Sequence, residues 1–236
     1  MRILLVIPAH NEEENLPRLL HEVRQEGYDA VVVDDASTDA TAELAGGEGF
    51  PVVSLAVNLG IGGSVQTGFL YGVRKNYDVV VQVDGDGQHD PKWIPVIIAP
   101  ILAGEADCVI GSRYRPEAPD IEYRTPLTRR IGMYFSTGLL LLATGIRIHD
   151  TTSGFRALNR GAFSFFAKDY PVDHPEAESL LLLHNNGFRV REVAVKMRCR
   201  VKGKSMFSSV RAALYPMRVV IGFMGLLFKT SPRKRP

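Results

Sequence analysis

The stretch VVVQVDGDGQHDP (Val79–Pro91) joins a valine-rich run directly to three aspartates spaced by glycine. A short apolar run bounded by turn residues is typical of a buried strand. The acids that follow it form either a loop that stays solvated or a site for a cation. The rest of the chain has to distinguish these two interpretations.

The composition is that of a globular protein with one large domain: 236 residues, 45% hydrophobic and 23% charged. The net charge of +2 is too small to indicate a nucleic-acid partner. Cys108 and Cys199 fit no metal-ligand spacing and are predicted to be free thiols in a reducing cytosol. We find no signal-peptide pattern and no apolar run of the ~20 residues that a membrane span needs, and so expect a cytoplasmic protein.

Apolar runs and helical patterns alternate over the first 115 residues. The predicted strands are RILLVIPA, AVVVDDAS, PVVSLAV, DVVVQVDGD and ADCVIGSRY, and a later one is RVREVAVKMR. Near-continuous apolar strands separated by helices indicate an α/β fold, with a mostly parallel sheet covered by helices on both faces. We assign no strand to residues 150–166, and no repeat or linker divides the chain.

Polar or charged residues follow four of these strands, in PAHNEE, DDASTD, DGDGQHD and GSRYR. Ligands of parallel sheets bind outside the carboxyl ends of the strands. Any one of these segments could be an ordinary polar turn. Together at one edge of a sheet, they predict a ligand site.

The acid loop has the chemistry of a hard-cation site. Asp84 and Asp86 stand two residues apart, and neighbouring glycines let the backbone turn tightly. Carboxylate and amide oxygens suit Mg²⁺ or Mn²⁺. The chain lacks both a phosphate-binding glycine loop and a dinucleotide fingerprint, so a nucleotide would be held through a metal on its phosphates. Asp90 is expected to be a structural cap before Pro91.

Two interpretations remain open for Asp34 and Asp35 at the end of the second strand. One acid at this place often binds a ribose or a base in nucleotide-binding sheets. The other interpretation is helix capping, with Ser37 or Asp39 as the cap, and both can be true at once.

Six segments together resemble glycosyltransferase family 2: IPAHNEEENL, VVVDDASTDATAE, NLGIGGSVQTG, VVQVDGDGQHDP, VIGSRY and DTTSGFRA. The resemblance runs from Ile3 to about Ser205 and is strongest to the branch of dolichol-phosphate mannose synthases and bacterial polyprenyl-phosphate glycosyltransferases. It implies a GT-A (Rossmann-like) fold over residues 1–207, with a nucleotide-binding half at 1–115 and an acceptor-binding half at 116–207. It also implies inverting transfer of a hexose from a nucleotide sugar such as GDP-mannose or a UDP- or dTDP-hexose.

The resemblance assigns donor contacts to the first two loops. Pro8, His10 and Glu12 stand where the family's first loop touches the nucleotide, with His10 in place of a frequent tyrosine. Asp35 corresponds to the acid on the uracil or guanine side of the donor.

The same resemblance assigns the metal and the phosphates. Asp86 and Gln88 correspond to metal ligands, and Asp84 to a third ligand or a water-mediated contact. Asp84, Gly85 and Asp86 would also line the donor. Arg113 corresponds to an arginine near the donor and acceptor phosphates, so that Asp86 and Arg113 would act in catalysis by stabilising the diphosphate leaving group.

Two hypotheses differ in the group that accepts the sugar, either a lipid phosphate or a hydroxyl of a glycan. A lipid phosphate is already a nucleophile at neutral pH, whereas a hydroxyl of a glycan needs a carboxylate to take its proton. Glu176 and Glu178 occupy the place of that base in hydroxyl-using relatives. Favourable charge in a first helical turn explains the same two residues.

A basic series favours a phosphate acceptor. Lys196, Arg198, Arg200, Lys202 and Lys204 alternate, so an extended strand would present them on one face. A strand edge protected by lysines would look similar. Arg200 matches a phosphate-gripping arginine of the family, and is the third predicted catalytic residue.

Three further basic residues complete the predicted phosphate contacts. The family's final lysine is replaced by Met206, and Lys204 is the candidate substitute. Arg129 and Arg130, at the start of an apolar helix, are candidates for a lipid phosphate headgroup. The alternative is an ordinary solvated helix start, but cations are unfavourable at that end of a helix, and this favours the functional interpretation.

The tail at residues 208–236 is an apolar, amphipathic helical segment followed by basic residues. One interpretation is an interfacial helix that binds the membrane surface, either directly or beside a separate membrane protein. The other is a final helix packed on the core. We expect a protein peripheral to the inner face of the cell membrane.

Overall fold

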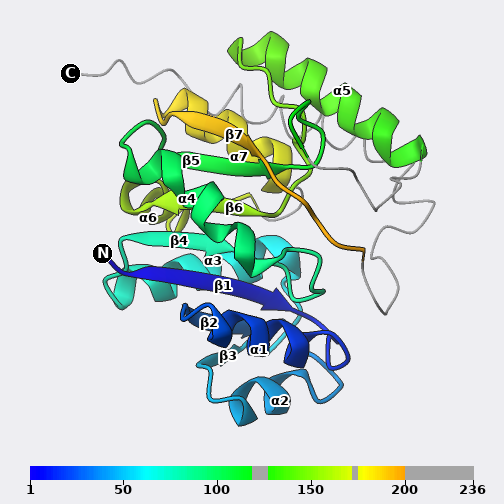
Figure 1. The fold of residues 1–236 in the computed structure, drawn as a ribbon, viewed down its shortest axis with the longest axis vertical. Helices are drawn as coiled ribbons and strands as arrows, with labels where there is room; N and C mark the ends of the chain where they lie inside the picture. The colour runs from blue at the N-terminus through cyan, green and yellow to red at the C-terminus, as the bar shows by residue number, and fades with distance from the viewer. Residues whose placement is uncertain (119–126, 172–174, 200–236) are drawn as a thin grey trace.

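The computed structural model describes residues 1–118, 127–171 and 175–199. Within these residues the chain forms a seven-stranded sheet with the strand order β3-β2-β1-β4-β6-β5-β7 (Figure 1). The strands are β1 (Ile3–Ala9), β2 (Asp29–Asp34), β3 (Val52–Ser54), β4 (Val79–Gln82), β5 (Cys108–Ser112), β6 (Arg156–Asn159) and β7 (Val190–Ala194).

Helices cover both faces of this sheet, as the sequence predicts. They are α1 (Leu16–Gln25), α2 (Thr41–Gly47), α3 (Gly60–Arg74), α4 (Ile94–Leu102), α5 (Leu127–Thr144), α6 (Arg160–Phe166) and α7 (Pro175–Asn185), with a 3₁₀ turn η1 (Pro91–Trp93). In Figure 1, α4 lies in front of the sheet and α3 behind it, while α5 lies at one end of the molecule.

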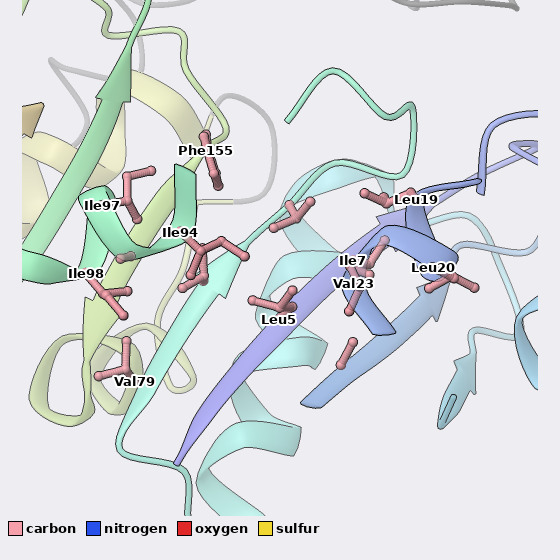
Figure 2. Packing of buried hydrophobic residues seen from close by; sticks show 14 of the residues in the cluster. Leu5, Ile7, Leu19, Leu20, Val23, Val79, Ile94, Ile97, Ile98 and Phe155 are labelled. Carbon is pink, nitrogen blue, oxygen red and sulfur yellow. The ribbon is translucent and has the colours of Figure 1, made fainter. Parts of the chain in front are cut away.

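Successive side chains of each strand enter opposite cores. Leu5 and Ile7 of β1 pack with apolar residues of α1 and α4, whereas Leu4 and Val6 face α3 and α6. Figure 2 shows the first of these cores. This alternation explains why the central strands are apolar throughout, since both of their faces are buried.

The sheet is mixed rather than wholly parallel, because β6 runs antiparallel between β4 and β5. Sequence reasoning assigned no strand to residues 150–166, and this was wrong for Arg156–Asn159. The strand has only four residues and includes a buried arginine, so it lacks the apolar run that marks its neighbours. The remaining pairs are parallel, and the predicted mostly parallel α/β architecture is confirmed.

The strand order places a topological switch point between β1 and β4. From β1 the chain winds outward through β2 and β3, and then returns to β4 on the other side of β1. The carboxyl ends of β1 and β4 therefore lie where ligands of open α/β sheets usually bind.

None of the helices described is long and apolar enough to cross a membrane. The predicted interfacial tail at 208–236 and the domain boundary at 207 lie outside the described residues. The basic series lies beyond β7, which ends at Ala194. Of that series, Lys196 and Arg198 alternate with the buried Val195 and Met197, as expected for an extended segment.

Candidate active site

The carboxyl end of β1 and the acid loop after β4 are in direct contact. The backbone N–H of Gly85 donates to the carbonyl of Pro8 at 3.2 Å. A Cβ atom at position 85 would lie 3.0 Å from that carbonyl oxygen and 3.2 Å from the Ala9 Cβ. Glycine therefore allows the acid loop to approach the first loop closely, and two segments predicted to touch the donor are brought together.

Asp35 organises the end of β2 and the start of α3. Its Oδ1 accepts a hydrogen bond from the backbone N–H of Leu59 at 2.7 Å, and its carbonyl lies 2.8 Å from His10 Nδ1. Asn58 Nδ2 donates to the same carbonyl at 3.2 Å. The residue is 4% exposed. The structure thus brings His10 and Asp35 together, as the donor-site prediction requires.

Neither Ser37 nor Asp39 stands at the N-cap of α2, because that position is Ala40, which makes no side-chain capping hydrogen bond. Asp39 Oδ1 accepts hydrogen bonds from Thr41 N at 3.0 Å and Thr41 Oγ1 at 2.5 Å at the start of α2. These bonds lower the pKa of Asp39, although burial, the largest influence, acts in the opposite direction. Ser37 instead accepts from the backbone of Asn11 at 3.0 Å.

Glu12 lies in the interior at the base of the first loop. It is 9% exposed, and its Oε2 accepts a hydrogen bond from Asn15 Nδ2 at 2.7 Å. Its backbone N–H donates to Thr41 Oγ1 at 2.8 Å. These contacts fasten the first loop to α2, and the predicted nucleotide contact of Glu12 stays a prediction.

Hydrogen bonds between residues close in the sequence determine the shape of the acid loop. Asp86 Oδ1 accepts from the backbone N–H of Gln88 at 3.0 Å. The backbone N–H of Asp84 donates to His89 Nδ1 at 3.0 Å, and the buried His89 ring stacks on Phe155 with centroids 4.8 Å apart. The buried His89 ring therefore holds the acid loop in place, because it contacts both the Asp84 backbone and Phe155. As predicted, Asp90 is a cap, accepting from Lys92 N at 3.1 Å.

A second loop, residues 149–155, closes on the acid loop from the other side. A Cβ atom at Gly154 would stand 2.7 Å from Asp84 Oδ2 and 3.0 Å from Oδ1. Gln82 Nε2 also donates to Asp84 Oδ1 at 3.1 Å. The Asp84 carboxylate thus has a fixed orientation, in contact with the DTTSGFRA segment.

Arg113 is a buried partner of that second loop. Its Nε and Nη2 bind Asp150 Oδ2 and Oδ1 at 2.8 and 3.0 Å, and its Nη2 lies 3.3 Å from Thr152 Oγ1. Arg113 is 6% exposed and Asp150 is fully buried. This bidentate pair holds the second loop on β5, while the predicted phosphate contact of Arg113 stays a prediction.

Sequence reasoning missed two residues that complete this network. The carboxylate of Glu192, on β7, accepts from the backbone N–H groups of His149 and Asp150 at 3.0 and 2.8 Å. Arg156 donates to the carbonyls of Ser153 and Thr151 and to Ser179 Oγ. Arg156 stands within the quoted segment DTTSGFRA, but only its burial distinguishes it from a surface arginine.

The acid loop is also fastened to the chain beyond β7. The backbone N–H of Arg198 donates to the Gln88 carbonyl at 2.9 Å, and its guanidinium binds Glu22 at 2.6 Å and Asp90 at 2.7 Å. Burial would lower the pKa of Arg198, but the two carboxylates more than offset this and raise it. This member of the basic series is therefore a fixed cation of the site's framework.

The predicted acceptor residues are only partly described. Arg129 and Arg130 lie near the start of α5, and Glu176 and Glu178 in the first turn of α7. Glu178 is half-buried, next to the Ser179 that binds Arg156. Arg200 and Lys204 lie outside the described residues.

The oxygen atoms that the acid loop offers suit a divalent metal ion whose other ligands come from a substrate. No three His, Cys, Asp or Glu side chains form a complete metal cluster in the part of the chain that the structure describes. The acid loop instead offers two carboxylates and the amide of Gln88. Mg²⁺ in phosphate-handling sites typically takes only one or two protein carboxylates, with substrate phosphates completing the shell.

Residues 4–166 match the family model described as glycosyl transferase family 2. The chain belongs to glycosyltransferase family 2. It is therefore a glycosyltransferase, and the resemblance inferred from its six segments is confirmed.

Among curated family 2 relatives, the polyprenol monophosphomannose synthase of Mycolicibacterium smegmatis is 32% identical over 91% of this chain and 84% of its own length. The undecaprenyl-phosphate mannosyltransferase of Micrococcus luteus is 34% identical over 66% of each chain. A UDP-N-acetylglucosamine–dolichyl-phosphate N-acetylglucosaminyltransferase of Methanococcus voltae is 28% identical over 82% of this chain and 84% of its own length.

Solved structures show the same fold. Glucosyl-3-phosphoglycerate synthase of Mycobacterium tuberculosis superposes with a TM-score of 0.72 over 95% of this chain and 79% of its own, at 20% identity. A further structure of that synthase holds Mn²⁺, UDP and phosphoglyceric acid, with a TM-score of 0.70. The GT-A-like fold implied by the sequence is thereby confirmed.

Proposed function

We propose that this protein is a metal-dependent, inverting hexosyltransferase that moves a sugar from a nucleotide sugar to a polyprenyl phosphate at the cytoplasmic face of a membrane. The observation that carries the proposal is the meeting of the first loop, the acid loop and the DTTSGFRA loop at the β1/β4 switch point. Gly85 against Pro8 and Gly154 against Asp84 make this meeting close.

The residues near the carboxyl ends of β1, β2 and β4 would bind different parts of the nucleotide sugar. Pro8, His10, Glu12 and Asp35 would surround the nucleoside, while Asp86 and Gln88, with Asp84, would hold Mg²⁺ or Mn²⁺. When bound, the ion would neutralise charge on the departing diphosphate. The names of two relatives specify mannosyl transfer and a third specifies UDP-N-acetylglucosamine, so several donor sugars are compatible with this framework.

A phosphate acceptor is supported by those same names, all of which specify a polyprenyl-type phosphate or polyprenol. A phosphate oxyanion attacks without a general base, so binding and orientation are the protein's main tasks. Arg113, Arg129, Arg130, Arg200 and Lys204 are the proposed contacts of the donor and acceptor phosphates. Arginine is suited to this because its planar fork can donate two hydrogen bonds to one phosphate. The fork of Arg113 made by Nε and Nη2 is already paired with Asp150, so this argument applies to Arg129, Arg130 and Arg200.

An exposed apolar stripe on α5 supports attachment to a membrane surface. Tyr134, Phe135, Leu141 and Leu142 are all exposed, Tyr134 by 60% and Leu142 by 87%. Their spacing of one and seven residues places them on one side of a helix. The opposite side, with Leu140, packs towards α7. Such a stripe suits the interface of a bilayer that presents a polyprenyl chain.

The second candidate is transfer to a glycan hydroxyl in polysaccharide synthesis, with Glu176 or Glu178 as base. The observation that favours it is the place of Glu178, half-buried beside the Ser179–Arg156 hydrogen bond of 2.6 Å. Glu178→Gln and Glu176→Gln distinguish the candidates, since only a hydroxyl acceptor needs the proton to be removed.

The test is incubation of the purified protein with radiolabelled GDP-, UDP- and dTDP-sugars, polyprenyl phosphate, and Mg²⁺ or Mn²⁺. We expect label in the lipid fraction with one of the donors, and none when the metal is chelated. Transfer only to an oligosaccharide, with a large loss of rate in Glu178→Gln or Glu176→Gln, would replace the first proposal by the second.

A further inference from the structure

Arg198 joins three segments that are distant in the sequence. Its Nη1 binds Glu22 Oε2 of α1 at 2.6 Å, and its Nη2 binds Asp90 Oδ2 of the acid loop at 2.7 Å. Glu22 also binds Arg18 through Oε1, and Asp90 also caps η1 through Oδ1. Each carboxylate thus uses one oxygen locally and the other for Arg198.

Backbone contacts place Arg198 directly behind the candidate metal ligands. His89 and Met197 form an antiparallel bridge, and the Arg198 N–H donates to the Gln88 carbonyl at 2.9 Å. The Gln88 side chain in turn donates to the Arg198 carbonyl at 3.4 Å through Nε2, its amide nitrogen. The amide nitrogen of Gln88 therefore points towards Arg198. The amide oxygen of Gln88 is then the atom that can bind a cation.

The surroundings make Arg198 more than a surface ion pair. Its side chain is 24% exposed, and those of Glu22 and Asp90 are 21% and 18% exposed. Arg198 and Asp86 also line one surface pocket between α1 and the acid loop, together with Asn15, Arg18, Glu22 and Gly87. A cation at this place offsets the mutual repulsion of the acids in the loop, and partial burial strengthens its effect.

We propose that Arg198 is a positioning residue that clamps the acid loop against α1 and sets the geometry of the metal ligands Asp86 and Gln88. The inference rests on the metal site of the proposed function. Partners behind metal ligands commonly change metal affinity by about 10- to 100-fold when removed.

The test compares Arg198→Met with Arg189→Met. Arg189 is the matched control because it precedes the same strand and binds Asp107 through an Arg–Asp pair, at the opposite end of β7. Free Mn²⁺ is measured by electron paramagnetic resonance in the presence of excess UDP or GDP, and Tm is measured in parallel. Neither readout requires turnover.

For Arg198→Met we expect the Mn²⁺ dissociation constant to rise about tenfold or more. In transfer assays the apparent KM for Mn²⁺ should rise more than the KM for the nucleotide sugar. Arg198→Lys should recover part of the affinity, because it keeps the charge but not the fork that spans two carboxylates. Arg189→Met should lower Tm without changing Mn²⁺ binding.

The proposal is wrong if Arg198→Met binds Mn²⁺ as the unmodified protein does while Tm falls as in the control. If Arg198→Met does not fold, the Mn²⁺ dissociation constants of Arg198→Lys and Glu22→Gln decide, and values equal to the unmodified protein's overturn the proposal. Asp86→Ala tests the metal site of the proposed function separately from the role of Arg198. Unchanged Mn²⁺ binding in that variant would show that the metal site itself is misassigned.

Discussion

Gly154 packs so closely on Asp84 that a Cβ atom at position 154 would lie 2.7 Å from the carboxylate oxygen Oδ2. Asp84 lies in the loop that follows β4, and Gly154 lies in the loop that precedes β6; these two strands are antiparallel neighbours in the sheet. Their contact joins the acid loop to the DTTSGFRA loop. It makes the orientation of Asp84 a property of the tertiary structure.

Gly154→Ala should reduce transfer because the new methyl group has to displace the Asp84 carboxylate. We expect a loss of up to about 100-fold in kcat, since small displacements of reacting groups have effects of that size. The free energy of unfolding should fall by about 1–3 kcal/mol from overpacking. Gly46→Ala on α2 is the control, because its Cβ meets nothing within 4 Å. A Gly154→Ala enzyme with unchanged kcat would show that Asp84 needs no fixed orientation.

Asp150→Ala should be strongly destabilising. It leaves the buried guanidinium of Arg113 without its bidentate partner, a change that commonly lowers the free energy of unfolding by about 3–5 kcal/mol. Urea denaturation measures the effect. Glu105→Gln, which breaks the exposed Arg191–Glu105 pair at 3.4 Å, is the matched control and should change stability by less than about 1 kcal/mol. Equal effects in the two variants would contradict the structural role given to Asp150.

Asp86→Ala should abolish transfer while the protein stays folded. Removal of a metal ligand should lower activity by more than the roughly 100-fold loss known for residues that support such ligands. The control is Asp78→Ala, an exposed aspartate just before the same strand, at its opposite end. Rates under saturating Mn²⁺ and far-UV circular dichroism check both parts. Near-normal activity in Asp86→Ala would remove Asp86 from the metal site.

Polar substitution of the α5 stripe should weaken membrane binding. Leu142 is 87% exposed, so Leu142→Ser combined with Tyr134→Ser loses little packing but removes apolar area from the proposed contact. Sedimentation with anionic liposomes should recover less protein. Leu102→Ser, at the end of α4 and 52% exposed, is the control. Equal sedimentation of all three proteins would count against α5 as a membrane contact.

The two cysteines should differ in reactivity. Burial raises the pKa of the Cys108 thiol to about 12, whereas Cys199 is exposed. Because the thiolate is the reactive form, a thiol reagent at pH 8 should label Cys199 at once and Cys108 only after unfolding. The raised pKa also means that the buried thiol's contribution to stability is complete below pH 9 and declines as the pH rises towards 12. Rapid labelling of both thiols in the native protein would contradict the burial of Cys108.

Much of the fold and part of the site follow from local sequence patterns. The apolar runs of β1 and β4 are unmistakable because both faces of these strands are buried. The acid loop is recognisable because glycine and aspartate follow such a strand directly. The short strand β6 has no comparable pattern, since it begins with Arg156, a charged residue that is buried and hydrogen-bonded to Ser153 and Ser179.

By itself, the sequence determined the α/β class, the family and the acid loop at the end of β4. Only the tertiary structure decided which partners hold that loop. Arg113 pairs with Asp150 across 37 positions, and Arg198 pairs with Glu22 across 176. The physical reason is that strand and helix periodicity reports each segment's own geometry. Ion pairs and close backbone contacts between distant segments depend on how the sheet brings those segments together.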